Sequence, residues 1–136
     1  MRLVIVPKKE LSDEQRRYLD ERLAAPEHQN DKGPSQVWNA YEGFLYAFIH
    51  KESNLPIAIA EASGRPVATP GWWVDSKFRG QGYGNEVVDL LAEFLKTDGV
   101  TDIGAILIES YCNEYDEQST RLARRIRNRF AETRDS

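Results

Sequence analysis

Short apolar runs bounded by turn-forming residues occur in five segments of the chain, and each has the length of a β-strand. Four-residue polar linkers separate the second run from the third and the third from the fourth, so these three are expected to form an antiparallel meander. The fifth run is apolar without interruption, which is typical of a strand covered on both faces. The expected strands are Arg2–Pro7, Phe44–His50, Leu55–Ala62, Val67–Val74 and Ile103–Ile108.

Apolar residues at helical spacing predict three helices, over residues 13–25, 85–96 and 116–130. Ser12 is placed to cap the first helix and Gln15 to reach back to it, as in a capping box. In the last helix acidic residues precede the arginines, which is the order that the helix dipole favours. The polar segment Pro26–Gly43 is predicted to be a loop with at most one helical turn. Its Trp38 either attaches the loop to the core or belongs to a lip over a substrate cleft.

These elements predict an α/β (α+β) fold with a mixed, mostly antiparallel sheet and flanking helices. A length of 136 residues is that of one domain, here taken as 1–136. Pro70 and Gly71 interrupt the fourth strand. Because proline has no N–H to donate, a bulge or bend is expected at this pair.

Charge and cysteine content narrow the possible functions. The chain has 18 Lys and Arg against 22 Asp and Glu, a net charge of −4, so neither general nucleic-acid binding nor binding to a membrane surface is expected. No apolar run approaches the length of a membrane span, and we expect a cytoplasmic protein. Cys112 is the only cysteine, which leaves no disulfide framework and no thiolate cluster for a metal.

Gly80, Gly82 and Gly84 alternate in a loop between the end of a strand and the start of a helix. Glycines let backbone N–H groups approach phosphate oxygens, and the helix N-terminus adds unpaired donors and a partial positive charge. The segment therefore predicts an anion site that suits a diphosphate. A Walker loop is excluded because no Lys-Ser or Lys-Thr follows, and the Rossmann pattern because Asn85 stands where it needs a glycine.

The loop resembles the acetyl-CoA-binding motif of the GNAT N-acetyltransferase superfamily, Arg/Gln-x-x-Gly-x-Gly/Ala, through Arg79, Gly82 and Gly84. Trp72 and Val74 match the strand that precedes the motif, although Ser76 stands where the family commonly has a proline. The order of elements agrees over residues 1 to 130. The resemblance implies a strand pair that splays to admit pantetheine, and acetyl-CoA as acyl donor with no metal.

By this resemblance the backbone of the glycine loop holds the diphosphate, with Asn85 opening the helix, and main-chain groups of Trp73 and Val74 bond pantetheine. The cofactor-binding residues so implied are Trp72, Trp73, Val74, Arg79, Gly80, Gln81, Gly82, Tyr83, Gly84, Asn85 and Asn113. The implied reaction is direct attack of a primary amine on acetyl-CoA in a ternary complex. The alternative is an acyl-CoA-binding sensor or interaction module with little turnover.

Acetyl transfer needs a base for the amine and benefits from an acid for the thiolate. Glu109, after the fifth strand, resembles a Glu of some family members and is the favoured base, with Glu61 as its rival. The tyrosine that many members carry in the last helix is missing, since Ala123 follows Leu122 there. The substitutes considered for the acid are Tyr111 and Tyr115.

Two further strands usually follow the last helix in this family, and no such run follows Phe130. Either the acceptor side is open, or a second copy of the chain completes it as a homodimer. The expected acceptor is an amine on a small molecule or a protein. The arginines of the last helix are read as a solvated face, with an acidic peptide or nucleic acid as the other reading and nucleic acid not expected.

Overall fold

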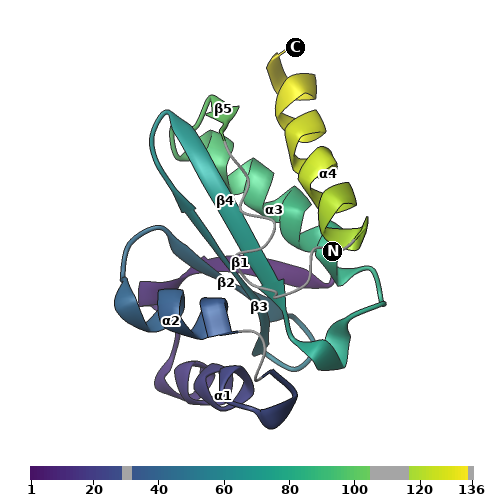
Figure 1. Ribbon diagram of the computed structural model, residues 1–136. Coiled ribbons are helices and arrows are strands. Elements are labelled where there is room, and N and C mark those ends of the chain that lie inside the picture. The colour runs from purple at the N-terminus through teal and green to yellow at the C-terminus, as the bar shows by residue number, and fades with distance from the viewer. Residues whose placement is uncertain (29–31, 105–116, 135–136) are drawn as a thin grey trace.

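A five-stranded sheet with strand order β1-β2-β3-β4-β5 forms the centre of the computed structural model (Figure 1). The structure describes residues 1–28, 32–104 and 117–134. Strands β1 to β4 pair antiparallel in sequence order, and β5 joins β4 in parallel. The strands are β1 Leu3–Pro7, β2 Leu45–His50, β3 Leu55–Ser63, β4 Val67–Val74 and β5 Asp102–Ile103. The predicted meander and the mostly antiparallel sheet are confirmed, while residues 105–108 of the fifth predicted strand lie outside the described residues.

Helices cover both faces of this sheet, with α1 and α2 on one side and α3 and α4 on the other (Figure 1). The capping box at α1 is present, because Ser12 Oγ accepts from the Gln15 N–H at 3.1 Å and Gln15 Oε1 accepts from the Ser12 N–H at 3.0 Å. The helices are α1 Asp13–Leu23, α2 Lys32–Ala40, α3 Tyr83–Thr97 and α4 Glu117–Arg134, with short 3-10 turns η1 Lys8–Glu10, η2 Pro26–His28 and η3 Ser76–Phe78. None of the helices in these described stretches is both long and apolar enough to pass through a bilayer.

The prediction of a loop over Pro26–Gly43 was wrong, because α2 occupies nine residues of it. The misleading signal was the Gly33-Pro34 pair, which lies in the first turn of α2, where a proline costs no hydrogen bond. Trp38 is 2% exposed and packs in the core between α1, α2 and the sheet, so it attaches this segment to the core.

The expected bulge at Pro70 and Gly71 is also absent from the pairing of β3 with β4. The register runs without a shift from Ala58 opposite Val74 to Ser63 opposite Thr69. The irregularity instead lies in the neighbouring strand pair, between Phe48 and Ile49. Pro70 fits the β3–β4 ladder because a backbone N–H at position 70 would point away from β3, toward β5. The missing N–H therefore costs no hydrogen bond to β3.

A buried lysine ties α2 to the first strand. Lys8 follows β1 and donates to the backbone carbonyls of Trp38 and, at 2.8 Å, of Tyr41, and its Nζ lies 3.3 Å from a Glu42 carboxylate oxygen. Carbonyls at a helix C-terminus carry a partial negative charge, so the ammonium satisfies groups that the end of α2 leaves unpaired. This contact fixes the helix that the sequence pattern missed.

Replacing Lys8 by methionine keeps the length of the side chain and removes its charge and its hydrogen bonds. We expect the free energy of unfolding to fall by about 2 kcal/mol, because the buried Trp38 carbonyl and the partly buried Tyr41 carbonyl lose a charged donor. Urea unfolding followed by circular dichroism measures the change. Lys9→Met is the matched control, since Lys9 is the exposed neighbour, and equal stability of the two variants would contradict this role of Lys8.

Candidate functional site

The glycine-rich turn before α3 places backbone N–H donors at the start of a helix. Gly80 and Gly82 have φ angles of 77° and 83°, in the left-handed region that favours glycine. Gly82 is the N-cap of α3, and no side chain caps the helix. The helix begins at Tyr83, two residues before the predicted start. The N–H groups of residues 82–85 therefore have no partner within the helix and lie at the positive end of its dipole.

Side chains of the turn fold back onto its own backbone. Arg79 Nε donates to the Val74 carbonyl at 2.8 Å, and Gln81 Nε2 donates to the Lys77 carbonyl at 3.2 Å. These bonds close the segment between the end of β4 and the start of α3. In this conformation Arg79 and Gln81 shape the turn, while its backbone presents the donors.

Tyr83 anchors the first turn of α3 to the start of the chain. Its buried hydroxyl is hydrogen-bonded to His50 Nε2 at 3.0 Å, and the Arg2 guanidinium lies over its ring at 3.8 Å from the centroid. Arg2 also pairs with Glu86, at 2.5 Å between Nε and the carboxylate. An Arg2 nitrogen would lie 3.4 Å from a Cβ placed on Gly82. Sequence reasoning missed Arg2, because nothing local shows that β1 brings it beside the glycine turn.

A buried carboxylate fixes the point where β4 ends and the turn begins. Asp75 is fully buried and binds Arg22 of α1 through both oxygens, at 2.7 and 2.9 Å. It also accepts from the Lys77 N–H at 3.1 Å and so caps η3. This bidentate pair joins α1 to the segment that leads into the glycine turn.

His28 and Glu27 extend this network from η2. His28 Nε2 accepts from the Ser76 N–H at 3.1 Å, so Nδ1 carries the proton and donates to the Arg22 carbonyl at 2.6 Å. The Ser76 hydroxyl donates to Glu27 at 2.5 Å. A proline at position 76 could make neither bond, which gives a physical reason for the departure from the family motif.

These contacts shift the pKa of both carboxyl groups downward. Burial opposes the ionisation of Asp75, but the hydrogen bonds from Arg22 and the Lys77 N–H outweigh it and hold its pKa below the usual range. The hydrogen bond from Ser76, followed by that from Arg22, lowers the pKa of Glu27 to about 2. Both groups are therefore ionised at neutral pH.

The backbone of β4 presents one edge to β3 and the other toward β5. The Asp75 N–H donates to the Ile57 carbonyl at 2.9 Å, and because donors alternate along a strand, Trp73 also points its backbone groups toward β3. The backbone groups of Trp72 and Val74 point the other way. The Trp73 ring is buried beside His28, with ring centroids 5.0 Å apart.

The hydrogen-bond ladder between β4 and β5 is interrupted at Pro70. The Gly104 N–H donates to the Ala68 carbonyl at 2.8 Å, and a donor at position 70 would complete the next rung. Pro70 has no N–H, and the Gly104 carbonyl instead accepts from Arg127 of α4 at 2.9 Å. The same guanidinium donates to the Ile103 carbonyl at 3.3 Å. At Pro70, this edge of β4 therefore lacks the ladder bond that the Gly104 carbonyl could accept.

Most of the residues predicted for catalysis lie outside the part of the chain that the structure describes. Glu109, Tyr111 and Tyr115, together with Asn113 of the cofactor set, lie outside the described residues and stay predictions. The rival base Glu61 is described. It lies opposite Gly71 and Leu45, on the face of the sheet that α1 and α2 cover. Among the residues that the structure describes, no group of three His, Cys, Asp or Glu side chains could hold a metal ion.

Comparison with known proteins relates this geometry to a family. Residues 1–128 match the family model described as the acetyltransferase (GNAT) domain. The solved acetyltransferase (GNAT family) from Bacillus anthracis is similar with a TM-score of 0.67 and 16% identity, over 93% of this chain and 79% of that one. A GNAT-family structure from Xanthomonas campestris pv. campestris has a TM-score of 0.55 and 13% identity, over 91% and 82%. No curated protein matches the chain.

The Asp75 network makes a testable contribution to stability. Because the pKa of Asp75 is lower in the folded than in the unfolded chain, its contribution is complete above pH of about 4 and is lost as the pH falls through the folded value. We expect Asp75→Asn to lower the free energy of unfolding at pH 7 by about 3 kcal/mol, since it leaves the Arg22 charge without its buried partner.

Urea unfolding of the parent protein and the variant from pH 7 to pH 3 measures this effect, with the exposed Asp20→Asn as control. The difference between parent and Asp75→Asn should shrink below pH 4. A difference that stays constant with pH would show that the Asp75 charge is not what stabilises the site.

Proposed function

Since the chain belongs to the GNAT acetyltransferase family, we propose that it binds acetyl-CoA and transfers the acetyl group to a primary amine. The observation that carries this proposal is the uncapped start of α3. The backbone N–H groups of residues 82–85 form a row of donors on a turn whose two left-handed glycines carry no side chain, with the Arg2 guanidinium beside Gly82. These backbone donors suit a diphosphate, because a helix N-terminus can bind phosphate oxygens without the help of a side chain.

The edge of β4 suits the next part of the donor molecule. The backbone groups of Trp72 and Val74 point toward the side where Pro70 omits a ladder bond. An extended chain with amide groups, such as pantetheine, can pair with a strand edge in the way that another strand does. The Val74 carbonyl already accepts from Arg79, so we assign the remaining backbone groups of Trp72 and Val74 to pantetheine in preference to those of Trp73, which point toward β3.

In the reaction we propose, a carboxylate takes a proton from the acceptor amine. The amine nitrogen then bonds to the acetyl carbon, the carbon–sulfur bond breaks, and its electron pair leaves with the sulfur. Glu109 is the proposed base and Tyr111 or Tyr115 the proposed proton donor to sulfur. Glu61 is the other candidate base, because Gly71 beside it leaves its side of the strand pair without a bulky side chain.

One observation favours the sensor alternative. Ala123 follows Leu122 in α4, where many family members carry a tyrosine, and it is 7% exposed in the packing of that helix. No hydroxyl can act from that position. An acyl-CoA-binding module with little turnover would have the same glycine turn and the same β4 edge. Only a measurement of turnover therefore distinguishes the two functions.

Gly82→Ala tests the binding site. Alanine at a φ of 83° costs about 1–2 kcal/mol, and we expect the free variant to relax its turn away from this angle. Because binding then has to restore the angle, we expect the Kd for acetyl-CoA to rise about tenfold by calorimetry. The matched control is Gly43→Ala, because a Cβ on Gly43 meets nothing within 4 Å and its φ is not in the left-handed region. An unchanged Kd in Gly82→Ala would remove the glycine turn as the diphosphate site.

Release of free thiol from acetyl-CoA with a panel of amines and peptides tests turnover. We expect Glu109→Gln to lower kcat at least about 100-fold with an unchanged Kd for acetyl-CoA, and Glu61→Gln to keep the parent rate. The opposite result assigns the base to Glu61. Binding of acetyl-CoA without thiol release from any acceptor would support the sensor function.

A further inference from the structure

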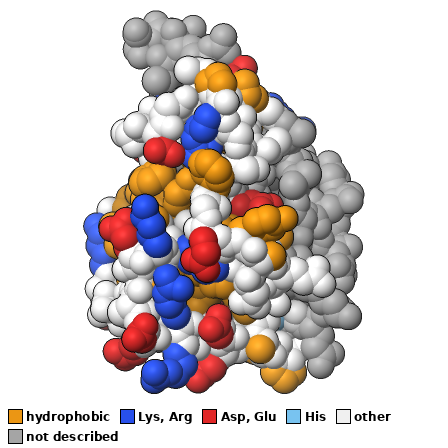
Figure 2. All heavy atoms as spheres, turned by 90° about the vertical axis from the view of Figure 1, so that its left-hand side faces the viewer, with side chains coloured by type: hydrophobic (Ala, Val, Ile, Leu, Met, Phe, Trp, Pro, Cys, Tyr) orange, Lys and Arg blue, Asp and Glu red, His pale blue; other side chains and the backbone are white. Residues whose placement is uncertain are grey.

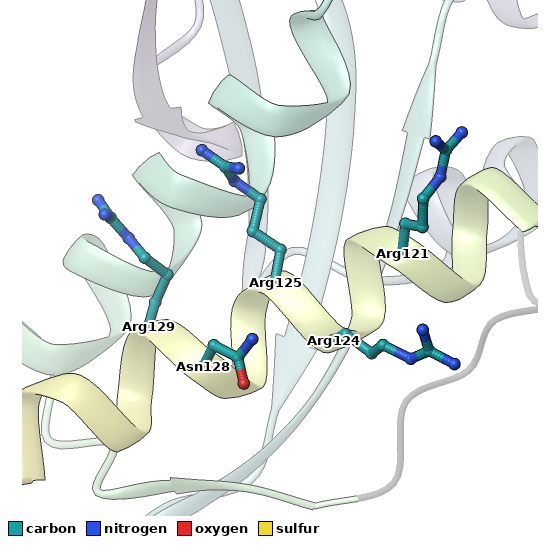
Figure 3. Close-up of a pocket in the computed structure, with 5 residues that line it drawn as sticks. All are labelled: Arg121, Arg124, Arg125, Asn128 and Arg129. Carbon is teal, nitrogen blue, oxygen red and sulfur yellow. The ribbon is translucent and has the colours of Figure 1, made fainter.

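Helix α4 carries a groove lined by arginines that the proposed reaction does not use. Its volume is about 340 Å³, and it is lined by Arg121, Arg124, Arg125, Asn128 and Arg129 (Figure 3). The spacing of three, four and eight residues places these side chains along one stretch of the helix surface. In Figure 3 the side chains of Arg121, Arg125 and Arg129 extend to one side of α4, and those of Arg124 and Asn128 extend in other directions from the helix.

Two of the arginines are already held in place by α3. Arg125 binds both oxygens of Asp89, at 2.8 and 2.7 Å, and Arg129 lies 3.5 Å from Asp89 and 3.8 Å from Glu93. Glu93 also pairs with Lys96 at 3.3 Å. The apolar face of α4 is buried, so the helix cannot turn the arginines away. The groove is therefore positioned before any ligand binds, which lowers the entropic cost of binding.

Arginines are concentrated along this part of the molecule. Four guanidinium groups line the groove, and Asp89 and Glu93 of α3 pair with two of them, those of Arg125 and Arg129. Helix α4 has six arginines and two glutamates, although the chain as a whole has a net charge of −4. The face that lies to the left in Figure 1 has acidic and basic side chains intermixed (Figure 2). The arginine groove is thus a local feature of α4.

The chemistry of the lining selects carboxylate-bearing or phosphate-bearing ligands, because the guanidinium fork pairs with both. The eight residue-to-residue steps from Arg121 to Arg129 extend over about 12 Å of helix, which an extended peptide covers with about four residues. The acidic remainder of the chain opposes a long polyanion such as a nucleic-acid strand. A short acidic segment contacts the arginines and is repelled less by the negative charge of the rest of the chain.

We propose that the α4 groove binds a short acidic segment of a partner polypeptide. The N-terminal ends of α3 and α4 lie near each other (Figure 1), so a segment bound there extends beside the glycine turn. If the partner is the acceptor, the groove selects amines carried by proteins with acidic segments. That last step rests on the proposed function, whereas binding of the segment does not.

The test uses the full chain and a dye-labelled peptide with four consecutive glutamates between Gly-Ser flanks, with binding measured by fluorescence anisotropy at low salt and without acetyl-CoA. Arg124→Glu is the informative variant because Arg124 is exposed and lies outside the pairs with α3. We expect its Kd for the peptide to rise at least tenfold and its melting temperature to stay unchanged. Arg17→Glu, an exposed arginine on α1, is the matched control and should keep the parent Kd.

Three outcomes would overturn the proposal: equal Kd values for the parent and Arg124→Glu, equal binding of a peptide with glutamine in place of glutamate, or tighter binding of an oligonucleotide of the same charge. The role of the partner is read separately. With an acidic amine-bearing peptide as acceptor, Arg124→Glu should raise KM at constant kcat. Absence of thiol release with retained, Arg124-dependent peptide binding would refute the proposed transferase function and leave the groove assignment standing.

Discussion

The buried pair of Asp75 and Arg22 determines where β4 ends and the segment that leads into the glycine turn begins. A fully buried carboxylate is tolerated only with a charged partner and satisfied oxygens, and Arg22 and the Lys77 N–H supply both. The pair draws the end of α1 onto the end of β4. Through the Arg22 carbonyl, His28 and the Ser76 N–H, the same contact reaches η2. The position of the glycine turn therefore depends on residues more than fifty positions apart in the chain.

The strand that this pair terminates carries both parts of the proposed donor site. Pro70 withholds a ladder bond on the edge toward β5, and Arg127 satisfies the carbonyl that would have accepted it. The same edge carries the backbone groups of Trp72 and Val74, and the Val74 carbonyl holds Arg79 at the start of the turn. In the proposed site, an extended amide chain along this edge and an oxyanion at the start of α3 follow one another along a single segment. The missing donor at Pro70 interrupts the β4–β5 ladder without a bulge in the register of β3 and β4.

Local sequence patterns predicted the elements whose formation depends on neighbouring residues. The first four strands, the capping box of Ser12 and Gln15 and the glycine turn follow from hydrophobic spacing and backbone preference, and the structure contains them. The helix α2 was missed because a Gly-Pro pair signals a turn and a helix start equally well. Arg2 beside Gly82 and the burial of His28 arise from contacts across the sheet, which no window of sequence displays. The catalytic candidates at 109–115 rest on the resemblance alone, since they lie outside the described residues.

Each face of the sheet carries its own set of charged groups. On the side of α1 and α2, the carboxylates of Asp75 and Glu27 are engaged by Arg22, and their lowered pKa values keep them as anions inside the network. On the side of α3 and α4 lie the positive end of the α3 dipole and the arginines of the groove. A chain of net charge −4 repels anions at long range, so only anions that reach these two positive regions gain from them. In the two proposed sites, selection of anionic ligands therefore depends on short-range geometry at α3 and α4, and the overall charge of the chain acts against nonspecific polyanions.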